Sequence, residues 1–433
     1  MPTDQLDIRP AHAVHGTLEV PGDKSVSHRY VMLGAIARGV TTATHLAPGA
    51  DVASTVACLR ALGAPIELAA LQTLRVQGLG RRGLTPARTM LDAGNSGTTL
   101  RLLAGLLAGH PFRSTLTGDA SLRRRPMRRV IDPLTAMGAR ITSDDGRAPL
   151  QIDGGNLAGT AWISPVASAQ VKSAILLAGL HAHGTTSVRE PLATRDHTER
   201  AFRAFGLPVS TDGLTAAVTG GHEATAPAEV LRIPGDPSSA AVWAAAAAAL
   251  PGSEVRIDRV CLNPHRLGFA RALERMGAVV DLETDDEVAG EPVGSIRVVH
   301  GDHRSTTIGA SEVPSLIDEL PVLAARAALG GSLEVTGASE LRVKESDRIT
   351  ALVAGLRALG VDARELIDGF QINGGDGRRR PAGGSADAAG DHRLVMAFAL
   401  VALGASGPSV ITGAGVVAVS YPDFAADLHR LVR

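Results

Sequence analysis

One pattern recurs six times along the 433-residue chain: an apolar helical stretch, a glycine, and then a β-branched run. A second pattern interleaves with it, in which a helix ends in Leu, Met or Phe followed directly by glycine. We expect each such glycine to adopt the left-handed conformation that ends a helix. The first pattern has Gly39, Gly109, Gly184, Gly252, Gly331 and Gly407, at intervals of 68 to 79 residues, and the second has Gly63, Gly138, Gly206, Gly277 and Gly360.

A repeat of this length carries two helices and several strands, so it is a folding module rather than a common solenoid unit. Helix, glycine and strand follow one another in any α/β protein, but the regular spacing favours a true repeat. Glu19-Val-Pro-Gly-Asp23-Lys-Ser is echoed three repeat lengths later by Arg232-Ile-Pro-Gly-Asp236-Pro-Ser. We therefore predict an α/β protein with two domains of three units each. Residues 1–21 and 234–433 form one domain, residues 22–233 form the other, and a hinge lies near 20–22 and 233–235.

Composition and charge exclude several functions. The net charge of −1 argues against a general nucleic-acid binder. Two cysteines, Cys58 and Cys261, rule out a disulfide scaffold and fit a reducing compartment. Residues 1–15 lack the apolar stretch of a signal peptide, and the longest apolar run, 240–250, is too short to span a bilayer. We expect a cytoplasmic protein whose partners include neither nucleic acid nor membrane, with an alanine-packed core because aromatic residues are only 3%.

The segment Pro21-Gly-Asp-Lys-Ser-Val-Ser-His-Arg29 carries the strongest chemical signal. A turn at 21–23 places Lys24, Ser25 and Arg29 in the first turns of an apolar helix that ends at Arg38-Gly39. Unpaired N–H groups at a helix start already favour an anion, and the cations strengthen this preference. The segment therefore predicts a phosphate and carboxylate site, although a capped helix with solvated charges is an equal alternative. The segment does not match a P-loop kinase, whose lysine follows a glycine-spaced loop, because only Gly22 is present here.

The first helix of every unit starts with polar residues, and we expect these starts to converge on one anion-attracting cleft between the domains. Each start could instead be a plain cap, and Asn95, Ser168, Asp236 and Asp391 are good caps. That alternative does not explain cations at helix starts, because they oppose the helix dipole. The starts are Lys24–Arg29, Asn95–Arg101, Ser168–Lys172 (with Gln170), Asp236–Ser239, Asp318-Glu319 and Asp391–Arg393.

Two segments of the first half contain further candidates. Gly97 leaves room for a ligand to touch the backbone where a Cβ would intrude. The run 123–129 holds five arginines, which fit either a nucleic-acid surface without aromatics or a solvated basic face. Pro126 holds Arg125 in an extended backbone, so we predict an inward carboxylate clamp there.

Charged residues also precede two later helices. Thr194-Arg-Asp-His-Thr-Glu199 resembles a capping box, and its Arg195 either reaches a ligand or is structural. Lys344 and Arg348 are one helical turn apart and are expected to face one side, although a solvated helix start is an alternative. Asp318 and Glu345 near such cations could act as an acid and base pair. The Cys and His residues follow no metal-ligand spacing, so we expect no metal.

Taken together, these segments resemble the EPSP synthase (3-phosphoshikimate 1-carboxyvinyltransferase) family, from about Gly16 to Leu431. The resemblance implies two domains, each of three βαβαββ units, arranged as an inside-out α/β barrel. The motifs that carry it are Pro21–Arg29, Asp92–Arg101, Thr117–Pro126, Ser168-Ala-Gln170, Arg342–Arg348, Asp391-His-Arg393 and Tyr421-Pro422.

The resemblance also implies a reaction, in which the carboxyvinyl group of phosphoenolpyruvate moves to the 5-hydroxyl of shikimate 3-phosphate and phosphate is released. Asp318, assisted by Lys24, would take the hydroxyl proton, and Glu345 would protonate the methylene carbon and later remove that proton. No cofactor is implied, and a monomer is expected. Shikimate 3-phosphate would be held by Lys24, Ser25, Arg29, Ser168, Gln170, Arg195, Asp318 and Lys344, and phosphoenolpyruvate by Lys24, Gly97, Arg125, Gln170, Arg348 and Arg393.

Two other functions remain open at this point. UDP-N-acetylglucosamine enolpyruvyl transferases resemble this family, but they usually carry a loop cysteine as acid and an asparagine after the first lysine, where this chain has Ser25. A non-catalytic anion-binding protein is the other alternative, against which Asp318 and Glu345 argue. The resemblance also includes glyphosate-tolerant forms with alanine at the position of Gly97, so we expect glyphosate to compete with phosphoenolpyruvate here.

Overall fold

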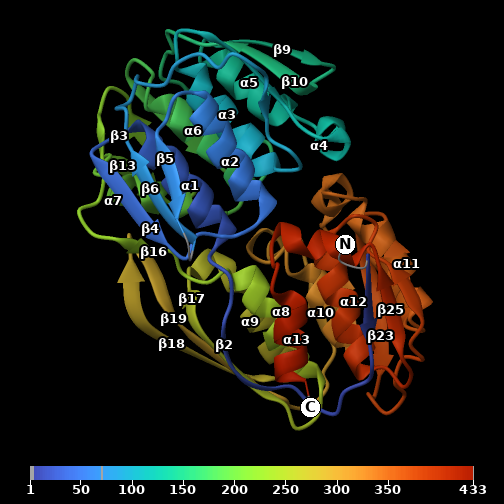
Figure 1. Ribbon diagram of the computed structural model, residues 1–433. Coiled ribbons are helices and arrows are strands. Elements are labelled where there is room, and N and C mark those ends of the chain that lie inside the picture. Colours follow the sequence, from blue (N-terminus) through green and yellow to red (C-terminus); the bar gives the residue numbers. More distant parts are fainter. Residues whose placement is uncertain (1–3, 70–71, 433) are drawn as a thin grey trace. The chain divides into compact units, whose positions relative to one another are not determined.

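The computed structural model describes residues 4–69 and 72–432 (Figure 1). Contacts between Cα atoms divide the chain into two compact units. Unit 1 contains the chain up to Pro21, residues 235–286 and everything from Pro292 on, and unit 2 contains residues 22–234 and 287–291. The chain passes between the units at Pro21-Gly22 and at Pro234-Gly235, and it enters and leaves unit 2 once more around residues 287–291. Each unit has its own hydrophobic core of buried aliphatic and alanine side chains.

Three four-stranded sheets surround the core of unit 2, in the part of the chain that is described. Their strand orders are β16-β4-β6-β5, β7-β8-β10-β9 and β11-β12-β14-β13. In each sheet the first two strands are parallel and the remaining neighbours are antiparallel. The strands are β4 (Val40–Thr44), β5 (Ile66–Ala69), β6 (Thr73–Gln77), β7 (Leu91–Asp92), β8 (Arg113–Thr117), β9 (Arg140–Asp144), β10 (Arg147–Asp153), β11 (Ala161–Ile163), β12 (Thr185–Arg189), β13 (Val209–Asp212), β14 (Thr215–Thr219) and β16 (Leu231–Arg232), with β3 (Ala37–Arg38) and β15 (Ala224–Thr225) as a separate pair.

Unit 1 repeats this arrangement. Its described residues form sheets ordered β18-β19-β17-β2, β20-β21-β23-β22 and β1-β25-β24. Each again contains one parallel pair, β2 with β17, β20 with β21, and β24 with β25. The six repeats seen in the sequence therefore correspond to one recurring mixed sheet. The strands are β1 (Gln5–Ile8), β2 (His15–Glu19), β17 (Glu254–Cys261), β18 (Val279–Val288), β19 (Glu291–Val299), β20 (Thr306–Ile308), β21 (Gly331–Val335), β22 (Asp362–Leu366), β23 (Gly369–Gly375), β24 (Ser385–Asp387) and β25 (Ser409–Thr412).

Three helices in each unit are enclosed on nearly all sides, and these are the helices whose polar starts the sequence singled out. In unit 2 they are α1 (Lys24–Ile36), α3 (Gly97–Ala108) and α6 (Ala169–Gly179), and in unit 1 they are α8 (Pro237–Ala249), α10 (Leu320–Ala328) and α12 (His392–Gly404). The remaining helices bury one face: α2 (Ala50–Ala61), α4 (Ala120–Arg124), α5 (Arg128–Ala136), α7 (His197–Ala204), α9 (Gly268–Arg275), α11 (Arg348–Ala358) and α13 (Phe424–Leu431). Short 3-10 turns lie at η2 (Pro264–Arg266), η3 (Val313–Ser315), η4 (Ser339–Val343) and η5 (Ala414–Val419).

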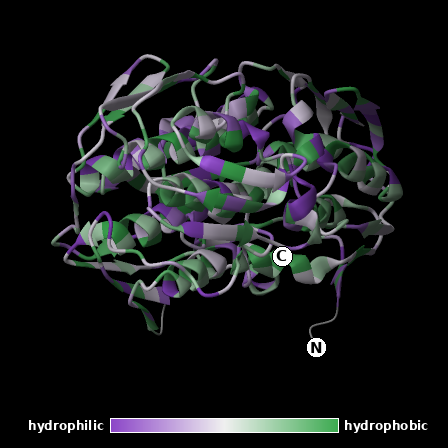
Figure 2. Cartoon of the chain, turned by 90° about the horizontal axis from the view of Figure 1, so that it is seen from above, coloured by the Kyte–Doolittle hydropathy of each residue, from purple (hydrophilic) through white to green (hydrophobic). Residues whose placement is uncertain are grey.

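Small residues let the enclosed helices approach closely, as the low aromatic content predicted. A Cβ on Gly105 of α3 would lie 2.2 Å from the carbonyl oxygen of Ala174 on α6. Every residue of α8 is buried, and eight of its thirteen residues are alanine. Hydrophobic colour extends along many of the helices in Figure 2, with the hydrophilic residues more frequent in strands and loops. Among the described residues, no helix is long and apolar enough to cross a membrane.

The prediction of a left-handed glycine is confirmed throughout the second pattern and in part of the first, where Gly39, Gly184, Gly252 and Gly331 have positive φ but Gly109 and Gly407 do not. The second set, Gly63, Gly138, Gly206, Gly277 and Gly360, all have positive φ and directly follow a helix C-cap. In the first set, Gly109 is itself a C-cap with right-handed φ of −87°. The first helix ends at Ile36, not at Arg38-Gly39, because Ala37 and Arg38 turn extended and pair with β15.

Candidate active site

The start of α1 is set by its N-cap residue, Asp23, whose backbone is extended; the turn predicted at 21–23 is not found there. The Asp23 carboxylate accepts from the Val26 N–H at 2.9 Å and so caps the helix. Lys24 is the first helical residue, and its Nζ lies 2.8 Å from Asp51 Oδ2 at the start of α2. The Lys24 ammonium is therefore held at a helix N-terminus by a partner that sequence reasoning missed. Asp51 lies in the first turn of α2 (Ala50–Ala61), directly after the N-cap residue Gly49.

Arg29 lies one turn further along α1 and is buried. Its Nε donates to Thr198 Oγ1 at 2.7 Å, and one terminal nitrogen donates to Ser173 Oγ at 2.6 Å. The other terminal nitrogen donates to the Ser25 carbonyl. Burial lowers the pKa of Arg29 to about 10, opposed chiefly by Glu199. The charge of Arg195 also lowers this pKa, so the fold brings two of the predicted phosphate ligands within electrostatic reach of each other.

At the start of α3 the cap differs from the prediction. Ser96, not Asn95, accepts from the Thr99 N–H, which leaves the Asn95 side chain to bind elsewhere. A Cβ on Gly97 would lie 2.6 Å from an Arg101 guanidinium nitrogen and 3.4 Å from one of Arg125. The missing side chain at Gly97 therefore makes room for two cations.

Arg101 is a residue that sequence reasoning named only as the end of a motif. Its guanidinium donates to Gln170 Oε1 at 2.6 Å, and the Gln170 amide donates to Thr98 Oγ1 at 2.9 Å. Gln170 lies on α6, so this chain of bonds joins the starts of α3 and α6. Position 101 is one helical turn after Gly97 on the same face, and this spacing was the available signal.

Arg125 follows α4 in an extended backbone, with φ −75° and ψ 143°, as Pro126 predicted. It is buried, and one of its terminal nitrogens lies 2.5 Å from Asn95 Oδ1. Asn95 in turn donates to Asp119. Ser168 caps α6 by accepting from the Val171 N–H at 3.5 Å, as predicted. Unit 2 thus gathers its cations and hydroxyls at the starts of α1, α3 and α6.

Unit 1 gathers three cations around one carboxylate just before α10. The Lys344 ammonium lies 3.6 Å from Asp318 Oδ1, and the Arg348 guanidinium lies 3.7 Å from the same oxygen. Arg393 lies 3.7 Å from Oδ2 and also donates to the Asp318 carbonyl at 3.1 Å. The Asp318 side chain remains 15% exposed, so it is accessible to a small molecule.

Arg348 is almost fully buried and bonds to two further carboxylates. Its Nε donates to Asp391 Oδ2 at 2.7 Å, and it forms a short bond with Glu345. The neighbouring carboxylates, Asp391 first, raise its pKa despite burial. Burial lowers the pKa of Lys344, against the opposing effect of Asp318. Lys344 lies outside the helix, because α11 begins only at Arg348, so the prediction that the two share a helix face was wrong. They meet at Asp318 instead.

One further local prediction was wrong. Thr194 does not cap a helix, because α7 begins at His197 and its N-cap residue, Asp196, makes no side-chain cap bond. The Thr194 hydroxyl donates to Glu190 at 2.7 Å. Of the partners whose contacts the sequence did not predict, Asn95, Arg101 and Asp391 lie within quoted motifs, whereas Asp51 lies outside all of them.

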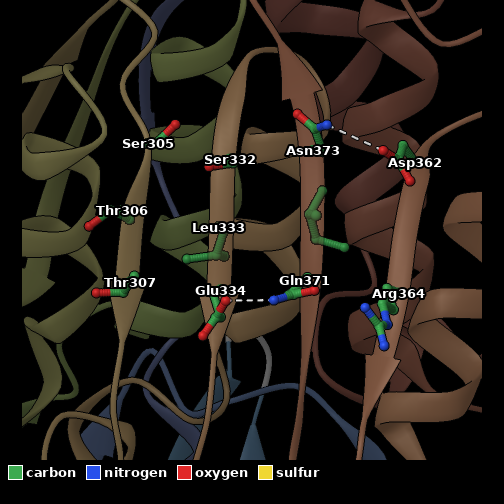
Figure 3. Close-up of a pocket in the computed structure, with 11 residues that line it drawn as sticks. Ser305, Thr306, Thr307, Ser332, Leu333, Glu334, Asp362, Arg364, Gln371 and Asn373 are labelled. Carbon is green, nitrogen blue, oxygen red and sulfur yellow. Dashed lines mark hydrogen bonds between the residues drawn. The ribbon is translucent and has the colours of Figure 1, made fainter.

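A hollow lies elsewhere, in unit 1. About 840 Å³ lies over the sheet β20-β21-β23-β22 of unit 1, lined by hydroxyl, amide and charged side chains. Glu334 accepts from Gln371 at 2.6 Å and Asn373 donates to Asp362 at 3.2 Å (Figure 3). None of the predicted site residues lines it, so hollowness by itself does not mark the chemistry of this chain.

The two residue sets define a class of protein. Cations and hydroxyls at helix starts bind phosphate and carboxylate groups. Two carboxylates beside cations provide a base and an acid for proton transfer. Fold and site together define an α/β enzyme that acts on anionic substrates through acid–base chemistry.

Comparisons with known proteins specify this class. The family model for EPSP synthase (3-phosphoshikimate 1-carboxyvinyltransferase) matches residues 8–428. The chain is 50% identical over 420 residues to a 3-phosphoshikimate 1-carboxyvinyltransferase of Acidithiobacillus ferrooxidans, covering 97% of this chain and 96% of that protein. A protein of the same name from Halorhodospira halophila is 50% identical over 429 residues, covering 98% and 95%. A solved EPSP synthase from Acinetobacter baumannii superposes with a TM-score of 0.87 at 42% identity, covering 99% and 98%. The chain belongs to the EPSP synthase family.

Proposed function

We propose that this chain transfers the carboxyvinyl group of phosphoenolpyruvate to the 5-hydroxyl of shikimate 3-phosphate and releases phosphate. Membership of the family supports this reaction over most of the chain length. The observation that carries it to particular residues is the position of Asp318, whose two carboxylate oxygens face Lys344, Arg348 and Arg393. A carboxylate held at this position among the cations that would bind the anionic substrates can act as the base for the 5-hydroxyl.

Both substrates are multiply charged anions, and we assign the cationic and polar residues of the site to one substrate, to the other, or to both. We assign Lys24, Ser25, Arg29, Ser168, Gln170, Arg195, Asp318 and Lys344 to shikimate 3-phosphate. We assign Lys24, Gly97, Arg125, Gln170, Arg348 and Arg393 to phosphoenolpyruvate. The buried bonds of Arg29 and Arg125 support these assignments, because a guanidinium already fixed by neighbours loses little freedom when it binds an anion.

In the proposed chemistry Asp318, assisted by Lys24, removes the proton from the 5-hydroxyl. Glu345 protonates the methylene carbon of phosphoenolpyruvate, which makes the neighbouring carbon electrophilic. The alcohol oxygen adds to that carbon and gives a tetrahedral intermediate. Glu345 then takes a methyl proton back as phosphate leaves, and the cations stabilise the charge that develops on the leaving group. Its short bond to Arg348 supports a fixed position for Glu345.

The residues assigned to each substrate come from both units. We propose that the units are the two domains of an inside-out barrel, with three βαβαββ modules each, spanning 1–21 with 234–433 and 22–233. The recurring sheet with one parallel pair supports the modules. The hinge lies at 20–22 and 233–235, where Asp23 donates to the Pro234 carbonyl and Asp236 to that of Pro21. Closure at this hinge would exclude water during the reaction.

The deciding experiment mixes the protein with phosphoenolpyruvate and one acceptor, shikimate 3-phosphate or UDP-N-acetylglucosamine, and measures phosphate release. We expect release with shikimate 3-phosphate alone. Phosphate release only with UDP-N-acetylglucosamine would show that the chain catalyses the sister reaction instead. Binding of the substrates without phosphate release, with either acceptor, would show that the chain is a non-catalytic anion-binding protein.

Two observations already weigh against the sister reaction. Cys58 is buried within α2 rather than on a loop, and burial raises the pKa of its thiol to about 12. A thiol held in this way is a poor proton donor to a substrate. We also propose a cytoplasmic monomer that needs no cofactor or metal.

A further inference from the structure

A buried ion-pair cluster joins α6 to α7 in unit 2, and the proposed reaction uses none of its members. Lys172 Nζ lies 2.8 Å from Glu190 Oε2 and 2.9 Å from Glu199 Oε1. The three side chains are each at most 6% exposed. A buried ion pair gives little net stability compared with an apolar core, so its presence calls for another explanation.

The cluster lies one residue away from the groups that hold Arg29. Ser173 follows Lys172 on α6, and Thr198 precedes Glu199 on α7. The Ser173 and Thr198 hydroxyl oxygens lie 2.6 Å apart, and the Arg29 guanidinium donates to both. The ion pair and the hydroxyl pair are therefore adjacent links between the same two helices.

Glu190 anchors this link to the rest of the unit. Glu190 directly follows β12, and its carboxylate accepts a hydrogen bond from the Thr194 hydroxyl. Thr194 is the residue before Arg195 in the chain. Lys172 is thus held by two carboxylates. Glu190 fixes the segment that leads to Arg195, and Glu199 lies on α7. Glu199 Oε2 has no hydrogen-bond partner among the described residues, and the charge of Glu199 acts on Arg29.

We infer that the Lys172–Glu199 pair is a positioning device for the phosphate of shikimate 3-phosphate. The pair fixes the distance between α6 and α7. It thereby fixes the positions of the Ser173 and Thr198 hydroxyls, which orient the Arg29 guanidinium. The inference rests on the proposed function, because it assigns Arg29 to that phosphate. Lys172 and Glu199 do not touch the substrate and act through Arg29.

The test compares Glu199→Ala with Glu199→Gln in the full chain. Alanine removes the link and leaves Lys172 balanced by Glu190, whereas the glutamine carbonyl still accepts from the Lys172 ammonium. Dissociation constants for shikimate 3-phosphate are measured by calorimetry, with kcat and both KM values from phosphate release. We expect Glu199→Ala to bind shikimate 3-phosphate about 10- to 100-fold more weakly, the range for one lost charge-assisted hydrogen bond. The KM for phosphoenolpyruvate should change much less, and Glu199→Gln should restore most of the affinity.

Two further variants keep the test decisive. Leu150→Ala removes a buried side chain from β10, outside both α6 and α7, so it controls for lost stability. If Glu199→Ala does not fold, Glu199→Asp keeps the charge, withdraws it by one methylene, and should still weaken shikimate 3-phosphate binding.

Unchanged affinity in Glu199→Ala or Glu199→Asp would overturn the inference. So would a loss shared equally by both substrates and by Leu150→Ala. Failure of the parent protein to turn over the two substrates would instead overturn the proposed function, so the two failures are distinguishable.

Discussion

The buried guanidinium of Arg348 is held by the Asp391 carboxylate, with Nε 2.7 Å from Oδ2. The two residues lie 43 positions apart, at the starts of α11 and α12. Asp391 also caps α12 by accepting from the Arg393 N–H. The Asp391 carboxylate therefore fixes Arg348 and also the start of α12, which carries Arg393.

Asp391→Asn keeps a capping oxygen but removes the charge that faces Arg348. Breaking a buried ion pair costs about 3–5 kcal/mol, and we expect the lower end because Glu345 and Asp318 still face the guanidinium. The loss is measured by urea unfolding. Asp153→Asn is the matched control, because Asp153 also bonds to an arginine but on the surface, and it should leave the unfolding midpoint unchanged. Equal midpoints for both variants would contradict the prediction.

Asp318→Asn removes the proposed base for the 5-hydroxyl while keeping its shape. We expect kcat to fall by about 10²- to 10⁴-fold, the usual contribution of a general base. Both substrates should still bind, because the amide leaves the surrounding cations in place. Steady-state phosphate release measures the effect. Glu312→Gln, in a surface pair with Arg275, serves as the control and should keep its full rate. A parent-like rate in Asp318→Asn would exclude it as the base.

Glu345→Gln removes the proposed acid for the methylene carbon. The variant should lose kcat to a similar extent, and it should also stop incorporating solvent deuterium into the methylene group of phosphoenolpyruvate. Mass spectrometry of the recovered substrate distinguishes this from a binding defect. Undiminished deuterium incorporation would mean that another group supplies the proton.

Gly97→Ala places a methyl group where the Arg101 guanidinium now lies, 2.6 Å from its nitrogen. Arg101 must move, and the space beside Arg125 shrinks. We expect a higher KM for phosphoenolpyruvate and weaker inhibition by glyphosate, which should compete with phosphoenolpyruvate in the parent, with shikimate 3-phosphate binding retained. Gly309→Ala is the control, because no atom lies within 4 Å of a Cβ there. An inhibition constant that Gly97→Ala leaves unchanged would argue against glyphosate binding at this position.

His28 makes the fold sensitive to acid. The His28 side chain is fully buried, and its Nδ1 lies 2.7 Å from Thr55 Oγ1. In the sequence it lies between Lys24 and Arg29. Burial lowers its pKa to about 3, opposed by Asp51 and assisted by Lys24 and Arg29. Below pH 6.5 the unfolded histidine takes up a proton and the folded one does not, so stability falls with pH between about 6.5 and 3.

The expected slope is up to about 1.4 kcal/mol per pH unit in that window. His28→Gln should remove this slope, so the stability of variant and parent should converge or cross between pH 6.5 and pH 5 in urea unfolding. Measurements at pH 8, where His28 is neutral in both states, give the intrinsic effect of the substitution. A gap between the two proteins that is equal at pH 8 and pH 5 would contradict the prediction.

Much of the site could be read from the sequence because its residues lie at the starts of helices. Ser168, Asp236 and Asp391 cap their helices as expected, since a capping residue acts within three positions of itself. The extended backbone at Arg125 followed from Pro126 for the same reason. The caps that failed, Asn95 and Thr194, were displaced by a neighbour or by a distant partner.

The sequence alone determined the mixed α/β architecture, the recurring module and the places where cations meet helix starts, because spacing, caps and glycines are local properties. Only the tertiary structure decided which charges face each other. The pairing of Arg348 with Asp391, of Lys24 with Asp51, and of Lys172 with Glu199 joins different helices. Such contacts depend on how helices pack, and no periodicity along the chain encodes which carboxylate a buried cation will meet.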